Sequence, residues 1–157
     1  MVITGGYQHN LRVILTLLAG SQHKVVFEEP GYFLGQRILE HTCQQLHSVP
    51  VDNDGLDMQF LLRHHHDARL LFATPSHQSP LAVTLSLPRR QQLLAWATQH
   101  NSWVVEDDYD SEFHYTRKVV PALKSRRIRG VGDKLTQEDF FVGIKRVDHQ
   151  MQKLFYF

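Results

Sequence analysis

The chain has 157 residues, of which 42% are hydrophobic and 10% aromatic, so it can bury the core of one globular domain and does not have the composition of a disordered chain. Lysine and arginine number 17 against 16 aspartates and glutamates, and the net charge of +1 excludes a general electrostatic case for binding nucleic acid or an anionic membrane. The single Cys43 excludes an internal disulfide and fits a reducing cytoplasm, while no apolar run is long enough to span a bilayer and the start does not resemble a secretory signal.

The first predicted elements are a short apolar stub at Val2 and Ile3 and a helix that begins after a glycine pair. Leu11, Leu15 and Leu18 recur at helical spacing. Glycines directly before a helix let backbone N–H groups point outward, and the positive end of the helix dipole attracts an anion. A candidate phosphate cup is therefore Thr4-Gly5-Gly6-Tyr7-Gln8, although the same pattern is also a common way to begin a helix.

A strand, a helix and a second strand are predicted next. Residues 24–28 have the apolar pattern of a buried strand that ends at Glu29-Pro30-Gly31, and residues 32–41 have a helical pattern. Tyr32 lies in the first turn after the strand end, where its ring could cover a bound ring or could pack between helices. Residues 45–51 then predict a strand, followed by a turn at Asp52-Asn53-Asp54-Gly55 and a short helix over 56–63.

The alternation of strands and helices continues to Phe113. Residues 69–73 predict a buried strand, and the loop 74–80 is expected to be rigid because a proline lies near each end. Residues 87–100 predict an amphipathic helix with Leu93, Leu94 and Ala97 facing inward. The alternation predicts an α/β fold: a mostly parallel sheet with helices on both faces.

The stretch with the most chemical content follows this helix. Trp103, Val104 and Val105 predict a buried strand, and five carboxylates follow before Phe113. In open α/β sheets ligands bind at the carboxyl ends of the strands. Asp107 and Tyr109 are two residues apart and share a face of a strand, so they could offer a negative charge and a phenol to one flat ligand. The alternative is that the acidic segment is a solvated loop.

Two metal hypotheses also arise from the sequence. His64-His65-His66 belong to a total of 11 histidines, but three consecutive residues cannot point the same way, so a solvated helix end is favoured over a metal site. Asp107, Asp108 and Asp110 could hold Mg²⁺ in a domain that accepts a phosphoryl group. That second hypothesis gives no role to Tyr32 or to the glycine pair.

Four motifs resemble, in order and spacing, the aminotransferase-like domain of MocR-type regulators in the GntR family. Those domains share the large domain of fold type I, pyridoxal-phosphate-dependent aminotransferases of class I/II. The similarity covers roughly residues 2–125, and its motifs are Thr4-Gly5-Gly6-Tyr7-Gln8, Glu29-Pro30-Gly31-Tyr32, Thr74-Pro75-Ser76-His77-Gln78 and Glu106-Asp107-Asp108-Tyr109-Asp110-Ser111-Glu112-Phe113.

The resemblance implies a role in binding pyridoxal 5′-phosphate for six residues. It implies that Gly6, Tyr7 and Gln8 hold the phosphate, mainly through backbone N–H groups. Tyr32 would stack on the pyridine ring. Asp107 would pair with the protonated ring nitrogen, which makes the ring an electron sink. Tyr109 would hydrogen-bond the phenolic oxygen of the ring.

The sequence also departs from the family pattern. Ser79 stands where related aminotransferases have an asparagine, and Ala82 stands where glycine is usual. The Ser-Lys pair whose lysine forms the Schiff base is missing after Phe113, since Lys124-Ser125 is reversed and too early and the tail lysines lack the expected context. Without that lysine no catalytic residue is assigned, and proton transfer loses its usual base.

The pattern of alternating elements is lost near Ser125. We expect residues 1–124 to form a partial aminotransferase-like domain and residues 125–157 to be an unmatched tail, frame-shifted or foreign, in which 139–144 could form one more strand. A winged helix-turn-helix domain before this domain and a small domain after it would be absent, so the chain is expected to be a fragment that does not bind DNA directly.

Topology gives the fragment hypothesis a physical consequence. If the last two strands of the family sheet are absent, the strand at Val2 and Ile3 has no neighbour and the acidic strand has an open edge, unless residues 140–144 fill the gap. The expected function is a pyridoxal-phosphate-binding domain without turnover whose ancestral ligand is a small amino compound. The alternative is a non-catalytic fragment that forms a homodimer or pairs with an intact homologue.

Overall fold

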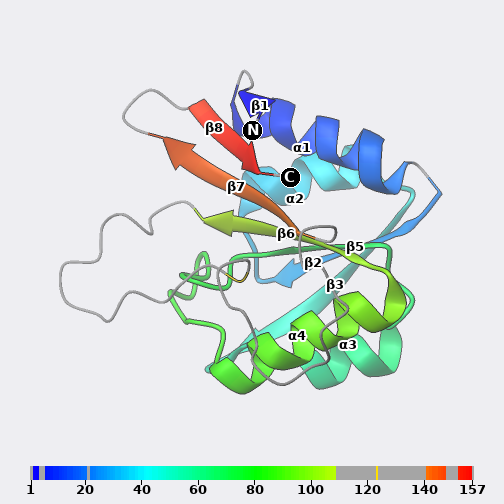
Figure 1. Cartoon of the computed structure of the whole chain (residues 1–157), viewed down its shortest axis with the longest axis vertical. Helices are drawn as coiled ribbons and strands as arrows, with labels where there is room; N and C mark the ends of the chain where they lie inside the picture. Colours follow the sequence, from blue (N-terminus) through cyan, green and yellow to red (C-terminus); the bar gives the residue numbers. More distant parts are fainter. Residues whose placement is uncertain are drawn as a thin grey trace, which may run out of the picture.

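The computed structural model describes residues 2–3, 6–20, 22–108, 123, 141–147 and 152–156. Within these ranges one eight-stranded sheet has the order β1-β8-β7-β6-β5-β2-β3-β4 (Figure 1). Its strands are β1 (Val2–Ile3), β2 (Lys24–Glu29), β3 (Gln45–Asp52), β4 (Gly55–Leu56), β5 (Leu70–Ala73), β6 (Trp103–Asp108), β7 (Phe141–Val147) and β8 (Gln152–Tyr156). The helices are α1 (Tyr7–Ile14), the π-helical η1 (Leu15–Ala19), α2 (Phe33–Thr42), α3 (Met58–His64) and α4 (Leu87–His100).

The centre of the sheet is parallel, as the sequence predicts. Strands β3, β2, β5, β6 and β7 pair in parallel, whereas β4 and β8 run antiparallel to their neighbours. The register aligns Val26 with Leu71 and Leu71 with Val104, so these apolar side chains form a row across one face. The predicted α/β fold class is confirmed.

Each face of the sheet carries its own hydrophobic core. Helices α3 and α4 cover one face, and α1, η1 and α2 cover the other (Figure 1). Along β5, Leu71 and Ala73 belong to the first core while Leu70 and Phe72 belong to the second. A strand with helices on both sides needs apolar residues at every position, which explains why the central strands are continuous apolar runs.

The helices form where their sequence patterns predict them, with two differences. The first helix continues beyond Ile14 as a π-helical turn, and Leu18 in that turn is only half-buried. The helix predicted over 56–63 begins instead at Met58, because Leu56 pairs with β3 and the Asp57 carboxylate accepts hydrogen bonds from two backbone N–H groups of the first turn.

The gap expected between the acidic strand and the first strand is filled. Strand β7 pairs in parallel with β6, and β8 pairs with both β7 and β1. The open edge that would follow from absent strands is therefore not present, because a hairpin from the tail supplies both positions. The strand predicted over 139–144 corresponds to β7, whereas β8 was not foreseen.

None of the helices in the described part of the chain combines the length and the hydrophobicity needed to cross a bilayer.

Candidate functional site

Three strand ends and two helix starts meet at one edge of the sheet. Strands β2, β5 and β6 are adjacent and parallel, so their carboxyl ends lie together, and the starts of α1 and α2 lie at the same edge. We call this the strand-end site and define it by Tyr7, Glu28, Tyr32, Gly35 and Asp107. Ligands of open parallel sheets bind at such an edge.

The start of α1 has the backbone features of an anion-binding turn. Gly6 is the N-cap residue with a φ of 111° and a ψ of −177°, a conformation that glycine adopts without strain. Its carbonyl oxygen accepts the first helical hydrogen bond from the Asn10 N–H at 3.0 Å. The first turn contains no acidic side chain, and Gln8 is exposed. An anion at this helix start would therefore meet N–H donors and no opposing carboxylate from the same turn.

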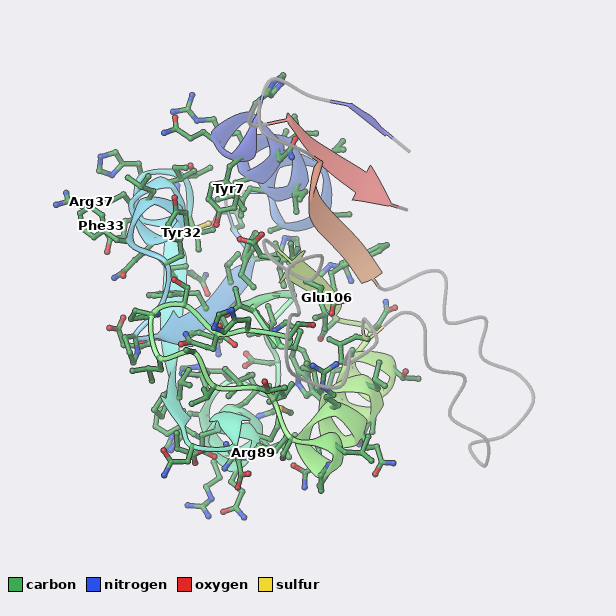
Figure 2. The ribbon with its side chains drawn as sticks, turned by 90° about the vertical axis from the view of Figure 1, so that its left-hand side faces the viewer. Tyr7, Tyr32, Phe33, Arg37, Arg89 and Glu106 are labelled. Atoms are coloured by element: carbon green, nitrogen blue, oxygen red, sulfur yellow. The ribbon has the colours of Figure 1, made fainter. Side chains whose placement is uncertain are left out.

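The side chain of Tyr7 turns inward from this helix start. Its ring lies edge-on to the Tyr32 ring, with centroids 5.4 Å apart and planes at 70° (Figure 2). A side-chain hydrogen bond joins Tyr7 to Asp107, in which the phenol donates to the carboxylate. Burial raises the pKa of the Tyr7 phenol above its ordinary value, and the charge of Asp107 raises it further. Tyr7 therefore remains a neutral donor.

The acidic residues at the end of β6 are buried. Glu106 is 4% exposed and Asp107 is 8% exposed, so the interpretation of a solvated acidic loop is wrong for both. Both carboxylate oxygens of Glu106 accept the backbone N–H of Leu123 at 3.1 Å, which ties a later part of the chain to β6. Tyr109 and Asp110 lie outside the described residues.

Tyr32 caps the start of α2 and is the most accessible member of the strand-end site. It is 42% exposed, and its neighbours Phe33 and Leu34 are exposed as well. The Arg37 guanidinium lies over the Phe33 ring at 5.0 Å from its centroid, and Figure 2 shows both on the outer side of α2. Tyr32 thus contacts Tyr7 and still exposes part of its ring, so the sequence hypotheses of a packing role and of a ring-covering role are compatible.

Glu28 is a member of the site that the sequence motifs do not indicate. Its Oε2 accepts the Thr74 N–H at 3.1 Å and the Thr74 hydroxyl at 2.5 Å, and Gln78 Nε2 lies at 3.4 Å. Burial raises the pKa of Glu28 to about 7; the donors from Thr74 and Gln78 oppose the shift, and the charge of Asp107 adds to it. The sequence signal that could have indicated Glu28 is a glutamate at the end of a strand whose preceding residues are apolar and do not alternate with polar ones.

The loop after β5 is held against the strand ends by Gln78. Its amide Nε2 donates to the carbonyl oxygens of Pro30 at 2.7 Å and Ser79 at 2.9 Å, and its Oε1 accepts the Leu81 N–H at 3.0 Å. Ala82 has a φ of 57°, in the left-handed region that favours glycine. This backbone conformation explains why glycine suits this position better than alanine.

The histidine run does not converge. The His64 ring contacts Phe60 at 4.5 Å, the His65 ring contacts His47 at 4.9 Å, and the His66 ring contacts His100 at 5.6 Å between centroids. In the described ranges no group of three or more histidine, cysteine or carboxylate side chains has the geometry of a metal site.

The sequence profile of aminotransferase class I and II matches residues 1–132. The chain belongs to this family.

Its curated relatives include transcriptional regulators. The chain is 36% identical over 123 residues to the uncharacterized HTH-type transcriptional regulator YdeL of Bacillus subtilis, covering 78% of this chain and 26% of that protein. It is 34% identical over 124 residues to the probable rhizopine catabolism regulatory protein MocR of Rhizobium meliloti, covering 79% of this chain and 25% of that protein. The predicted relationship to the aminotransferase-like domain of MocR-type regulators is confirmed, and the chain spans about a quarter of these relatives.

Solved structures show the same fold. The kynurenine aminotransferase of Pyrococcus horikoshii superposes with a TM-score of 0.77 at 23% identity, covering 92% of this chain and 35% of that one. At this identity the similarity establishes the fold alone. The fold is that of part of a fold type I aminotransferase.

Proposed function

We propose that the strand-end site binds pyridoxal 5′-phosphate and that the chain, as it stands, does not turn over substrate. The observation that carries the proposal is the meeting of Tyr7, Tyr32 and Asp107, which come from α1, the start of α2 and β6. A buried carboxylate, a half-exposed aromatic ring and a helix start without acidic residues fit the three parts of this cofactor: its ring nitrogen, its ring face and its phosphate.

Each proposed role suits the local chemistry. Backbone N–H groups at Gly6, Tyr7 and Gln8 would hold the phosphate, and Tyr32 would cover the ring. Asp107 would pair with the protonated ring nitrogen, because a buried carboxylate is a strong partner for a cation that a ligand brings into the site. We also assign Tyr109 to the phenolic oxygen of the ring, from the resemblance. The bound cofactor would supply an electron sink for a carbanion next to its imine.

The proposal of no turnover concerns the lysine. No Ser-Lys pair follows Phe113 in this sequence, so we assign no residue to the covalent attachment of the cofactor. The ligand that the domain recognises besides the cofactor is proposed to be a small amino compound.

A second candidate function is pairing with another chain. Tyr32, Phe33 and Leu34 are 42%, 60% and 47% exposed and form a contiguous apolar segment that begins at the strand-end site. Apolar surface of this kind marks interaction sites more often than scattered exposed residues do. The partner would be a second copy of this chain or an intact homologue in the cytoplasm, and analytical ultracentrifugation of the wild type against Phe33→Ser would test the first of these.

The test of cofactor binding is a titration of the purified chain with pyridoxal 5′-phosphate, followed by borohydride reduction and peptide mapping. We expect saturable binding to one site that Asp107→Asn weakens about tenfold or more, because the ring cation loses its charged partner. Asp54→Asn is the matched control, since Asp54 is an exposed aspartate in the turn after β3.

Two results of this test would change the proposal. Reduction at a single lysine would mean that an attachment lysine exists, and the proposal of no turnover would be withdrawn. No saturable binding, or scattered labelling of surface lysines with Asp107→Asn behaving as wild type, would overturn cofactor binding itself.

A further inference from the structure

The Tyr7 hydroxyl occupies a space that a side chain on α2 would otherwise fill. A Cβ built at Gly35 collides with the Tyr7 hydroxyl oxygen and lies 3.3 Å from the ring carbon that carries it. Gly35 is buried in the first turn of α2, and the Tyr7 ring packs against the core on this face of the sheet. The absence of a side chain at Gly35 therefore gives the phenol its place in the wall of the site.

The same hydroxyl contacts the one group of the site that would meet a ligand's ring cation. Tyr7 and Asp107 are 100 positions apart and come from α1 and β6, yet their side chains share a hydrogen bond. The carboxylate has two oxygens and about four lone-pair positions, so it can accept from the Tyr7 phenol and from a ligand at the same time. Asp107 also acts on Glu28, a second buried carboxylate of the site, because the charge of Asp107 opposes ionisation of Glu28.

We propose that Tyr7 is a positioning residue, which orients the Asp107 carboxylate toward the ring nitrogen of the cofactor and for which Gly35 provides the space. This inference rests on the proposed function, because it assumes that Asp107 meets a pyridine ring nitrogen. It assigns the Tyr7 side chain a role separate from the phosphate contact of its backbone. Tyr7 then acts at two places in the ligand site, at the phosphate through its backbone and at the ring nitrogen through Asp107.

The physical reason is the fixed direction of a buried hydrogen bond. A carboxylate on a short side chain can rotate about two bonds, and a donor held by packing removes that freedom before the ligand arrives. The phenol is suited to this because burial and the Asp107 charge raise its pKa, so it is protonated and donates at neutral pH. Its edge contact with Tyr32 at 5.4 Å holds the ring in place.

The test compares two probes that differ only at the ring nitrogen: pyridoxamine 5′-phosphate and its 1-deaza analogue, in which a C–H group replaces that nitrogen. The selectivity of a variant is its affinity for the first divided by its affinity for the second, measured by calorimetry. Tyr7→Phe removes the hydroxyl and keeps the ring. Gly35→Ala displaces the hydroxyl and adds a residue that favours helix. The double variant Tyr7→Phe/Gly35→Ala completes the cycle.

We expect the wild type to prefer the probe with the ring nitrogen, and Tyr7→Phe to lower this selectivity about tenfold, because the affinity for the probe with the ring nitrogen falls more than the affinity for the deaza probe. Gly35→Ala should lower the selectivity by a similar factor. It should add little in the Tyr7→Phe background, because the atom with which its Cβ collides is then absent.

Three results would overturn the inference, and they differ from failure of the proposed function. Unchanged selectivity in Tyr7→Phe would mean that Asp107 is oriented without Tyr7. An equal loss of affinity for both probes would mean that the hydroxyl supports only the general structure of the site. An additive effect of Gly35→Ala in the double variant would remove the role of Gly35. If the wild type binds neither probe, the proposed function itself fails and the positioning role fails with it.

Discussion

At the scale of single residues, the site contains a carboxylate whose charge state should govern part of the stability. Glu28 is buried, and its pKa is raised from 4.5 to about 7. The folded state therefore holds this proton more tightly than the unfolded state does. The contribution of protonated Glu28 to the free energy of unfolding is complete below pH 4.5 and is lost as the pH rises through about 7.

We expect Glu28→Gln to remove this pH dependence. The amide keeps an acceptor for Thr74 and cannot ionise, so the variant should gain stability relative to the wild type as the pH rises, by about 3 kcal/mol between the two limits. Urea unfolding at a series of pH values from 4.5 to 8 measures the difference. The control is Glu29→Gln, which removes a carboxylate at the exposed neighbouring position. Parallel curves for the wild type and Glu28→Gln would contradict the assignment.

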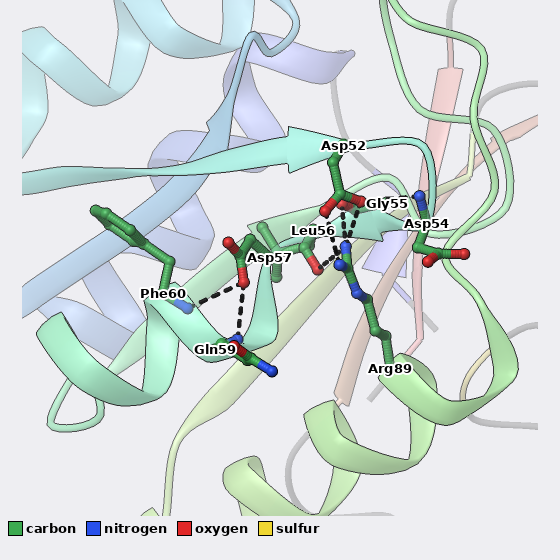
Figure 3. A network of polar contacts seen from close by, with 8 residues as sticks. All are labelled: Asp52, Asp54, Gly55, Leu56, Asp57, Gln59, Phe60 and Arg89. Atoms are coloured by element: carbon green, nitrogen blue, oxygen red, sulfur yellow. Dashed lines mark hydrogen bonds and ion pairs between the residues drawn. The ribbon is translucent and has the colours of Figure 1, made fainter.

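At the scale of elements, the side chain of an arginine on α4 binds the turn between β3 and β4 through hydrogen bonds and an ion pair (Figure 3). Arg89 donates to both carboxylate oxygens of Asp52 at 2.6 and 2.7 Å and to the carbonyl oxygens of Gly55 and Leu56 at 2.8 and 3.1 Å. The turn itself requires a glycine, since Gly55 has a φ of 93° and a Cβ there would lie 2.7 Å from the Leu85 Cα. The planar guanidinium is the group that can serve four acceptors in two directions.

Replacing this guanidinium by an ammonium tests how much the Arg89 hydrogen bonds contribute to stability. Arg89→Lys keeps the charge but cannot reach both carboxylate oxygens and both carbonyl oxygens together, so we expect a loss of about 1 to 2 kcal/mol in the free energy of unfolding. Chemical denaturation measures it. Arg63→Lys is the matched control, because Arg63 is exposed on α3 and donates one hydrogen bond, to Gln59 at 3.2 Å. Equal effects of the two substitutions would show that the extra acceptors contribute nothing.

At the scale of the whole molecule, the hairpin of β7 and β8 lies between the edge strand β1 and strand β6 of the sheet. Strand β8 pairs with β1, which directly precedes the glycine turn of α1, and β7 pairs with β6, which carries Asp107. The two halves of the strand-end site are therefore joined by this hairpin as well as by the Tyr7 hydrogen bond. Among the described strands, β1 has no neighbour other than β8.

Removal of β8 should loosen the first helix selectively. We expect a chain that ends at Val147 to lose hydrogen-exchange protection of the α1 amides by about tenfold or more, while α3 and α4 on the opposite face retain theirs. Deletion of Phe157 alone is the control, because it leaves β8 whole. Retained protection of α1 in the shorter chain would mean that packing on α2 is enough to hold it.

The sequence by itself determined the local elements and the family. Apolar periodicity predicted β2, α2, β3, β5, α4 and β6, because helix and strand patterns depend on neighbours a few residues apart. Four motifs predicted the aminotransferase-like domain, which the comparisons confirm. The general rule for parallel sheets then predicted that Asp107 lies at the ligand-binding edge.

Only the tertiary structure decided which of these residues meet. The sequence motifs assign Tyr7 a role only through its backbone N–H. Its side chain nevertheless shares a hydrogen bond with Asp107, 100 positions later in the chain, because Gly35 leaves room for the Tyr7 hydroxyl. Glu28 accepts hydrogen bonds from Thr74, 46 positions later, and the partner of β1 is an antiparallel strand from the tail. Local patterns cannot encode such pairs, because long-range contacts follow from how separate elements pack and not from the periodicity of any one of them.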